Sequence, residues 1–352
     1  MSGEMKKPDM SRESAPSSAF LEVDPVKRYA TCTLVITTLN EERNVGRLLD
    51  SVAGQTVLPS EIVIVDAGSK DHTLEVIERF AATRKNLRIT TYVEPGTIAH
   101  SRNFGIRRAT YDKILSTDAD CRLDYRFVEL MAQYLDEYDV VGGTYDVVPQ
   151  TWGEKVFNSR SRISWDEVDD LYVYPSMSIA FHRGVFNDVG GYDETLEASE
   201  DLDICLRWRK TPGVRLHLAH DVKLDHFLGR DYRTLLRISF NCVERDVSRG
   251  LATLGTPYWK MYVVAAMPFP ILLAIITGQD WLTAIVAGVL ASYLFVFFLR
   301  AAKRGVSPRL AAASTATELL VRLLQVAGVY SGLIKKALFL FRKPSDVPKK
   351  LG

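Results

Sequence analysis

Two carboxylates with one residue between them, Asp118 and Asp120, close a short apolar run that begins at Leu115. In an extended segment residues i and i+2 point to the same side, so both carboxylates can face one pocket. Adjacent carboxylates repel each other unless a cation lies between them, and Mg²⁺ or Mn²⁺ binds one or two carboxylates together with substrate phosphates. The pair therefore indicates a divalent-metal site for a nucleoside diphosphate. A solvated turn is the competing interpretation, because so short a pattern often arises by chance.

Length and composition limit the classes of protein that need to be considered. The chain has 352 residues, enough for more than one domain, and its formal net charge of +1 gives no support for a nucleic-acid partner. Its four cysteines are widely spaced, so neither a zinc site nor a disulfide framework is indicated. Residues 1–22 lack the apolar segment of a cleaved secretory signal, and we expect a disordered tail there.

Strand and helix patterns alternate along the first third of the chain. Apolar or β-branched runs predict strands over residues 32–39, 61–66, 87–93 and 113–116, with helices expected from residue 45 and from residue 74. This rhythm predicts an α/β fold with an open, mostly parallel sheet flanked by helices. Ligands bind at the carboxyl ends of strands in such sheets, and Asn40, Asp66 and Asp118 all stand at such ends.

Six short motifs occur in order between residues 32 and 210. They are Thr38-Leu39-Asn40-Glu41; Val65-Asp66-Ala67-Gly68-Ser69-x-Asp71-x-Thr73; Arg102-Asn103-x-Gly105; Asp118-Ala119-Asp120; Gly190-Gly191-Tyr192-Asp193-Glu194; and Glu200-Asp201-Leu202-Asp203. Together they resemble the inverting family 2 glycosyltransferases, which have the nucleotide-sugar-binding GT-A fold. Neither G-x-x-x-x-G-K nor G-x-G-x-x-G occurs. The chain therefore lacks the loops that are typical of phosphate-loop NTPases and of dinucleotide-binding enzymes.

The resemblance implies a nucleotide-diphosphate sugar donor held by the strand ends. Thr38, Asn40 and Glu41 would form one wall for the nucleotide, Asp66 would contact the base, and Asp118 the ribose. Local structure alone would also favour some of these residue types, because a turn selects Asn and a carboxylate after a strand can cap a helix.

The resemblance also implies an ion bound to the donor. The expected cofactor is Mg²⁺ or Mn²⁺, bound by Asp120 with Asp118 and His226, although a lone histidine is often only structural. Arg102 would pair with phosphate or with Asp118, or else lie on the surface as a solvated cation. A basic wall for the leaving nucleoside diphosphate is expected from Arg230, Arg233, Arg237 and Arg245.

Glu200 and Asp201 stand at the start of a predicted helix, where the helix dipole alone would favour negative charge. The resemblance implies that Asp201 is the general base that takes the proton of the acceptor hydroxyl, with Glu200 positioning the acceptor. The Gln-x-x-Arg-Trp motif of processive relatives is absent, which favours a single transfer per encounter.

The C-terminal part has the pattern of a membrane segment. Met261–Gln279 and Trp281–Leu299 are charge-free stretches close to the ~20 residues that span a bilayer, and they predict a transmembrane hairpin. Basic residues follow the second stretch, which places the catalytic domain on the cytoplasmic face of the cell membrane. Over 311–341 a narrow polar stripe predicts an interfacial amphipathic helix, with a buried helix packed on the hairpin as the alternative.

We therefore expect a disordered tail over 1–22, a GT-A domain over 23–258, a transmembrane hairpin over 259–300, and a basic loop, amphipathic helix and tail over 301–352. The expected function is inverting, metal-dependent transfer of a sugar to a lipid-linked saccharide. Polyprenyl-phosphate glycosyltransfer is the alternative within the enzyme class, since an ionised phosphate acceptor needs no base. An inactive sugar-nucleotide-binding membrane scaffold and a glycoside hydrolase, which also uses two carboxylates, are the alternatives of other classes.

Overall fold

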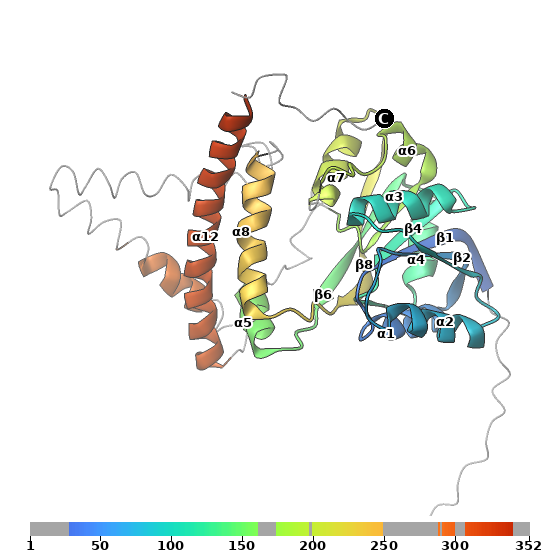
Figure 1. Ribbon diagram of the computed structural model, residues 1–352, viewed down its shortest axis with the longest axis horizontal. Coiled ribbons are helices and arrows are strands. Elements are labelled where there is room, and N and C mark those ends of the chain that lie inside the picture. The colour runs from blue at the N-terminus through green and yellow to red at the C-terminus, as the bar shows by residue number, and fades with distance from the viewer. Residues whose placement is uncertain are drawn as a thin grey trace, which may run out of the picture.

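One mixed sheet of eight strands organises the N-terminal part of the protein (Figure 1). The computed structural model describes residues 28–160, 174–196, 199–248, 288, 291–299 and 307–340. The strands are β1 (Arg28–Thr38), β2 (Val57–Asp66), β3 (Ile89–Val93), β4 (Lys113–Asp118), β5 (Cys121–Leu123), β6 (Val140–Val147), β7 (Ile179–His182) and β8 (Leu216–His226). Their order across the sheet is β3-β2-β1-β4-β7-β6-β8-β5.

The sheet has a parallel half and a mixed half. Strands β3, β2, β1 and β4 are parallel neighbours, as the strand–helix alternation predicts. Beyond β4 the pairing changes: β7 runs antiparallel to both β4 and β6, β8 is parallel to β6, and β5 is antiparallel to β8. The expected open α/β sheet is therefore confirmed, with a larger antiparallel share than predicted.

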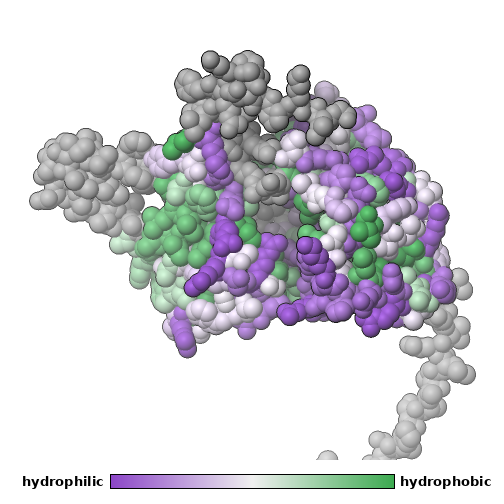
Figure 2. All heavy atoms as spheres, in the orientation of Figure 1, coloured by the Kyte–Doolittle hydropathy of each residue, from purple (hydrophilic) through white to green (hydrophobic). Residues whose placement is uncertain are grey.

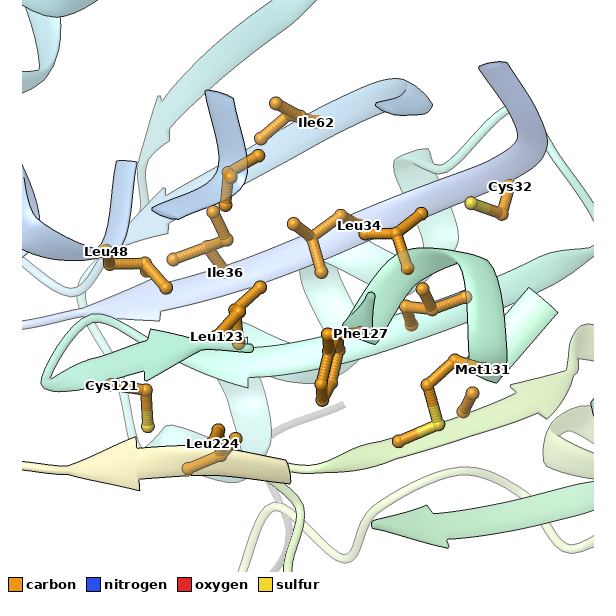
Figure 3. Close-up of a cluster of buried hydrophobic side chains, with 14 of the residues drawn as sticks. Cys32, Leu34, Ile36, Leu48, Ile62, Cys121, Leu123, Phe127, Met131 and Leu224 are labelled. Carbon is orange, nitrogen blue, oxygen red and sulfur yellow. The ribbon is translucent and has the colours of Figure 1, made fainter. Parts of the chain in front are cut away.

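Helices cover both faces of this sheet, so successive side chains over most of β1, which point to opposite faces, are buried. Leu34 and Ile36 face a core shared with α1 (Val45–Ala53), α2 (Thr73–Thr83) and α4 (Phe127–Tyr134), part of which Figure 3 shows. Val35 faces the other core, shared with α3 (Ile98–Arg108), α6 (Arg183–Asp188) and α7 (Glu200–Lys210). Each fully buried Leu or Ile contributes about 1.5–3 kcal/mol, so the two cores fix the strand ends rigidly.

Gly105 sets how closely α3 lies on the sheet. A Cβ atom at this position would lie 2.7 Å from Cγ1 of Val35 and 3.1 Å from Cγ2 of Val65. The absent side chain lets α3 approach β1 and β2 directly. One turn earlier on the same helix stand Arg102 and Asn103, and this close packing holds them near the carboxyl ends of the strands.

A second group of helices lies beside the sheet: α5 (Trp152–Arg160), α8 (Tyr232–Ser248) and α12 (Pro308–Leu340) (Figure 1). The Tyr232 hydroxyl is 2.7 Å from Oγ1 of Thr317 near the beginning of both α8 and α12. Further along, a Cβ atom at Gly332 of α12 would lie 2.5 Å from the carbonyl oxygen of Glu244 of α8. The two helices therefore run parallel and touch almost backbone to backbone.

Some boundaries and segments differ from expectation or lie outside the described residues. Strand β2 begins at Val57, before the predicted start at residue 61, and it includes Pro59, a residue that is uncommon inside strands. Most of the predicted hairpin over 259–300 lies outside the described residues; residues 291–299 are helical. Within the described part of the chain, Pro308–Lys335 is the one helix long and apolar enough to cross a membrane.

Candidate functional site

A cleft of about 350 Å³ opens at the carboxyl ends of β1, β2 and β4. Six of the residues selected from the sequence line it: Thr38, Glu41, Asp118, Asp120, His226 and Arg230. The remaining lining residues are Thr37, Leu39, Ala67, Gly96, Ile98, Ser101 and Ala119. The two carboxylates of the Asp-x-Asp motif thus face one cleft, as their spacing predicts.

One wall of the cleft consists of two interlocked loops. Asn40, with a positive φ of 55°, donates its backbone N–H to Oγ of Ser69 (2.8 Å), and its Oδ1 accepts the N–H of Lys70 (2.8 Å). Asp66 is fully buried, and its carboxylate accepts hydrogen bonds from the backbone N–H groups of Gly68 and Ser69 and from the Ser69 hydroxyl. Asn40 and Asp66 therefore shape this wall; the predicted base contact of Asp66 stays a prediction.

Glu41 places a third carboxylate in the cleft. Its backbone N–H donates to Oγ1 of Thr73 and its Oε2 accepts from the Asn44 amide, both at 2.8 Å. Burial raises the pKa of Glu41 above 4.5, and the nearby charges of Asp120 and Asp118 raise it further. The cleft thus concentrates negative charge and favours a cation.

Arg102 provides the positive charge that faces Asp118. Its side chain is only 2% exposed, and Nη2 lies 2.9 Å from both carboxylate oxygens of Asp118 while Nη1 lies 2.5 Å from Oε1 of Glu200. Although burial alone would lower the pKa of Arg102, Asp118 and Glu200 raise it, so the guanidinium stays charged. Thr37 adds a hydroxyl bond of 2.8 Å to Asp118. Of the three possibilities for Arg102, the structure supports pairing with Asp118 and contradicts the solvated surface cation, and pairing with a phosphate stays a prediction.

Asp120 pairs with a different partner. Oδ2 of Asp120 lies 3.0 Å from Nε2 of His226, and the backbone N–H of Phe227 donates to the Asp120 carbonyl at 2.8 Å. The end of β8 therefore presents the imidazole to the Asp-x-Asp turn, from 106 residues further along the chain. Among the residues that the structure describes, no group of three or more His, Cys, Asp or Glu side chains is arranged to hold a metal ion.

The start of α7 is connected to the cleft through Arg102, which contacts both Glu200 and Asp118. Glu200 is buried against Arg102, which ties the start of the helix to α3; the predicted acceptor-positioning role of Glu200 stays a prediction. Oδ1 of Asp201 accepts the backbone N–H of Leu202 at 2.7 Å, and Ser199 before the helix has a positive φ of 63°. Asp201 is half-buried beside Glu200 and is absent from the cleft lining.

Asn103 explains a motif whose role the sequence did not reveal. Its Nδ2 donates to the Tyr192 carbonyl and to Oε1 of Glu194, and its Oδ1 accepts the Tyr192 N–H, all within 2.9 Å. Gly191 has a φ of +73°, and a Cβ there would lie 3.0 Å from Oδ1 of Asn103. The Gly-Gly-Tyr-Asp-Glu segment is thus fastened to α3.

The expected basic wall is only partly present at the cleft. Arg230 lines it, and the backbone N–H of Arg230 donates to the buried Oε1 of Glu154 at 2.6 Å. Arg233 and Arg237 lie on the exposed side of α8 and do not line the cleft. Helical periodicity from Tyr232 onward could have separated these two arginines from Arg230.

Two buried hydroxyl groups beside the cleft have no hydrogen-bond partner within the described residues. They belong to Thr38 on β1 and Ser101 on α3. An unpaired buried hydroxyl costs about 1–3 kcal/mol. Such a group is therefore a candidate for a hydrogen bond with a bound water or ligand.

Comparison with known proteins agrees with this geometry. Residues 33–190 match the family model described as Glycosyl transferase family 2. Glycosyltransferase AglE of Haloferax volcanii is 26% identical over 218 residues, which are 59% of this chain and 70% of that protein. The glucosyl-dolichyl phosphate glucuronosyltransferase of the same organism is 27% identical over 227 residues, or 57% of this chain and 70% of that protein.

A solved structure shares the fold. Mannosyltransferase PcManGT from Pyrobaculum calidifontis, in complex with GDP-Man and Mn²⁺, aligns with a TM-score of 0.51 at 20% identity, covering 89% of this chain and 88% of that one. This likeness supports the expected GT-A type of sheet. The match identifies residues 33–190 as a Glycosyl transferase family 2 domain, and the relatives named as glycosyltransferases support a transferase enzyme.

Proposed function

We propose that this glycosyltransferase moves a sugar from a nucleoside-diphosphate donor to a lipid-linked saccharide, with inversion and with Mg²⁺ or Mn²⁺. The observation that carries the proposal is the cleft at the strand ends, where Asp120 pairs with His226 and Asp118 pairs with the buried Arg102. Thr38 and Ser101 add buried hydroxyls without partners among the described residues. These groups suit a ligand that carries both a metal-binding diphosphate and hydroxyl-rich sugars.

Asp120 and His226 fit the expected metal ion by their chemistry. The carboxylate of Asp120 is the oxygen ligand that Mg²⁺ and Mn²⁺ prefer, and His226, with Nε2 3.0 Å from Oδ2 of Asp120, would hold that carboxylate or act as a second ligand, leaving positions for the diphosphate oxygens. When bound, the ion would stabilise the negative charge of the leaving diphosphate. Asp118 is engaged by Arg102 and Thr37, so we assign it to orienting the donor rather than to binding the ion.

Asp201 is the proposed general base. Glu200 binds Arg102, which binds Asp118, so one buried cation connects the donor side of the cleft to the first turn of α7. Because an uncompensated buried charge costs about 3–5 kcal/mol, these side chains hold each other in place. Direct displacement with inversion needs one carboxylate to take the acceptor proton, and this network fixes the residue beside Asp201.

The lipid-linked acceptor is supported by the name of one relative, the glucosyl-dolichyl phosphate glucuronosyltransferase. Large apolar side chains are also exposed near the C-terminal end, and Figure 2 shows a hydrophobic area on the side where α12 lies. They are Phe295, Val296, Leu299, Leu320, Leu323, Leu333 and Ile334. A polyprenyl phosphate, the second candidate acceptor, has the same apolar chain but needs no base.

The packing of α12 on α8 favours a position along the cytoplasmic membrane surface. Helix α8 carries the exposed Arg233 and Arg237 and lies against α12 as far as Gly332. A charged side chain at the bilayer centre costs about 2.5–3.5 kcal/mol, so the α8–α12 pair is poorly suited to the hydrocarbon core. The buried Glu318 of α12, which accepts hydrogen bonds from Tyr293 and Arg322, agrees with this position.

We predict that both ends of α12 lie on one side of the membrane. In a background in which Cys242, the only cysteine that is not fully buried, is replaced by Ser, single cysteines are placed at Ser307 and Lys335. An impermeant thiol reagent should label neither in intact cells and both in inverted vesicles. Labelling of one position from outside and the other from inside would mean that α12 crosses the bilayer.

The proposed donor class is tested with purified full-length protein. UDP- and GDP-sugars are offered with and without Mn²⁺, and release of the nucleoside diphosphate is measured in the presence of a dolichyl- or undecaprenyl-linked saccharide or the corresponding polyprenyl phosphate. Release that requires the saccharide acceptor supports the proposal. Release with the phosphate alone would assign the second candidate, and absence of release or binding with every nucleotide sugar would exclude this donor class.

A further inference from the structure

His100 of α3 lies between two carboxylates that belong to different segments of the chain. Its Nδ1 is 2.7 Å from Oε2 of Glu194, and its Nε2 is 3.1 Å from Oε1 of Glu94. Glu94 follows β3, whereas Glu194 lies between α6 and α7. A neutral imidazole has one N–H group and an imidazolium has two, so only the protonated ring can donate to both carboxylates.

One of the two bridged segments leads directly to the cleft. Gly96 and Ile98 come shortly after Glu94 and line the cleft. Glu194 is also held by Asn103, whose Nδ2 donates to its Oε1 at 2.8 Å, and its carbonyl accepts from the Thr97 hydroxyl at 3.4 Å. The contacts of His100 with Glu94 and Glu194 therefore join the rim of the cleft to the segment around Glu194, before α7.

We propose that protonated His100 is a positioning residue, which bridges Glu94 and Glu194 and so fixes the cleft-lining segment Glu94–Ile98 against the segment that leads to α7. The functional part of this proposal rests on the proposed donor site, because a fixed rim would serve nucleoside-diphosphate binding. The bridge itself is independent of which donor is used.

The charges around the ring determine how the bridge responds to pH. Hydrogen bonds to Glu194 and Glu94 raise the pKa of His100 above 6.5. Burial alone would raise the pKa of Glu194, but its bonds with His100 and Asn103 lower it below 4.5, so this carboxylate stays charged. Arg107, 3.5 Å from Oε1 of Glu194, and Arg108, stacked on Phe104, are the cations of α3 on this side.

The direction of the pH effect follows from the raised pKa of the folded state. The double bridge is fully formed below pH 6.5, the ordinary value for His, and is lost as the pH rises through the higher pKa of His100. Above that pH one ring nitrogen no longer donates, and one of the two carboxylate contacts weakens.

The first test needs no ligand. Amide hydrogen exchange is compared between the wild type and His100→Gln at the same pH, because a glutamine side chain cannot become a cation. At pH 6 we expect the backbone around Gly96 and around Glu194 to exchange about fivefold faster in the variant, and we expect this difference to vanish at pH 9. The control is His182→Gln, since His182 also bonds through both ring nitrogens, to Asp112 and to the Leu135 carbonyl, but at the opposite ends of the strands.

The second test connects the bridge to the cleft. Binding of UDP and GDP with Mn²⁺ is measured by calorimetry from pH 6 to pH 9, and we expect the affinity ratio of wild type to His100→Gln to fall from about five toward one. The ratio for His182→Gln should stay constant.

Each outcome decides a separate point. Equal exchange in wild type and His100→Gln at pH 6 overturns the bridge. A pH-dependent exchange difference with a constant affinity ratio leaves a purely structural contact and overturns the positioning role. If the wild type binds neither nucleotide at any pH, the proposed donor class fails, and the exchange experiment alone decides the bridge.

Discussion

Asp201→Asn is expected to lower kcat by about a factor of 10² to 10⁴ and to leave donor affinity nearly unchanged. The amide keeps the shape of the side chain and an oxygen that can accept the Leu202 N–H bond, but it cannot take a proton from the acceptor hydroxyl. The first turn of α7 should stay in place, because Glu200 remains bound to Arg102. Steady-state rates with a lipid-linked saccharide and calorimetric binding of UDP or GDP separate the two effects.

A matched control for this substitution is Asp221→Asn. Asp221 accepts a hydrogen bond from the Tyr134 hydroxyl outside the cleft, so the same chemical change there should leave kcat within about twofold of wild type. Normal turnover by Asp201→Asn would show that another residue is the base or that none is needed. A polyprenyl-phosphate acceptor would then be favoured over the saccharide.

Asp120→Ala is expected to abolish the dependence of nucleotide binding on the metal ion. In the wild type, chelating Mn²⁺ should weaken UDP or GDP binding by about 10- to 100-fold or more. Loss of a single residue that orients a metal ligand already has an effect of this size. The variant should bind with the weak, chelator-insensitive affinity, because His226 alone cannot replace a carboxylate oxygen for a hard cation. Calorimetry with and without chelator measures both values.

Stability must be followed in the same experiment. Asp120 lies in a turn and its backbone carbonyl, which the substitution keeps, accepts the Phe227 N–H. We therefore expect the variant to fold, with a Tm near that of wild type. Wild-type affinity that does not change on chelation would contradict a metal role for Asp120.

Local sequence patterns predicted the parallel half of the sheet because each strand there is a short, self-contained apolar run. The run from Cys32 to Leu39 and the run from Glu61 to Asp66 can be identified without reference to any other part of the chain. Strands β6, β7 and β8 follow no such rhythm, since their pairing depends on partners far along the chain. The first part of β2, which contains Pro59, was not predicted for the same reason. This part of the strand is held extended by its pairing with β1.

The site was predictable to the extent that its residues follow strands. Spacing placed Asp118 and Asp120 together, and the family resemblance added Thr38; all three line the cleft. The role of Glu200 required knowing that Arg102, 98 residues earlier, lies within hydrogen-bond distance. By contrast, the helix that starts at Tyr232 is a local signal that separates Arg230, which lines the cleft, from the exposed Arg233, which does not.

The close contact between α8 and α12 has a consequence for the order in which the protein is completed during synthesis. Helix α8 follows the catalytic sheet directly. The helix that covers one side of it, α12 with Gly328 and Gly332, begins only about sixty residues after α8 ends. Domains generally fold from the N-terminus as they emerge from the ribosome, so the sheet can form while this side of α8 is still bare. A chain cut after Ser248 would keep that surface exposed permanently, and a soluble catalytic fragment would have to retain α12 or carry polar substitutions on α8.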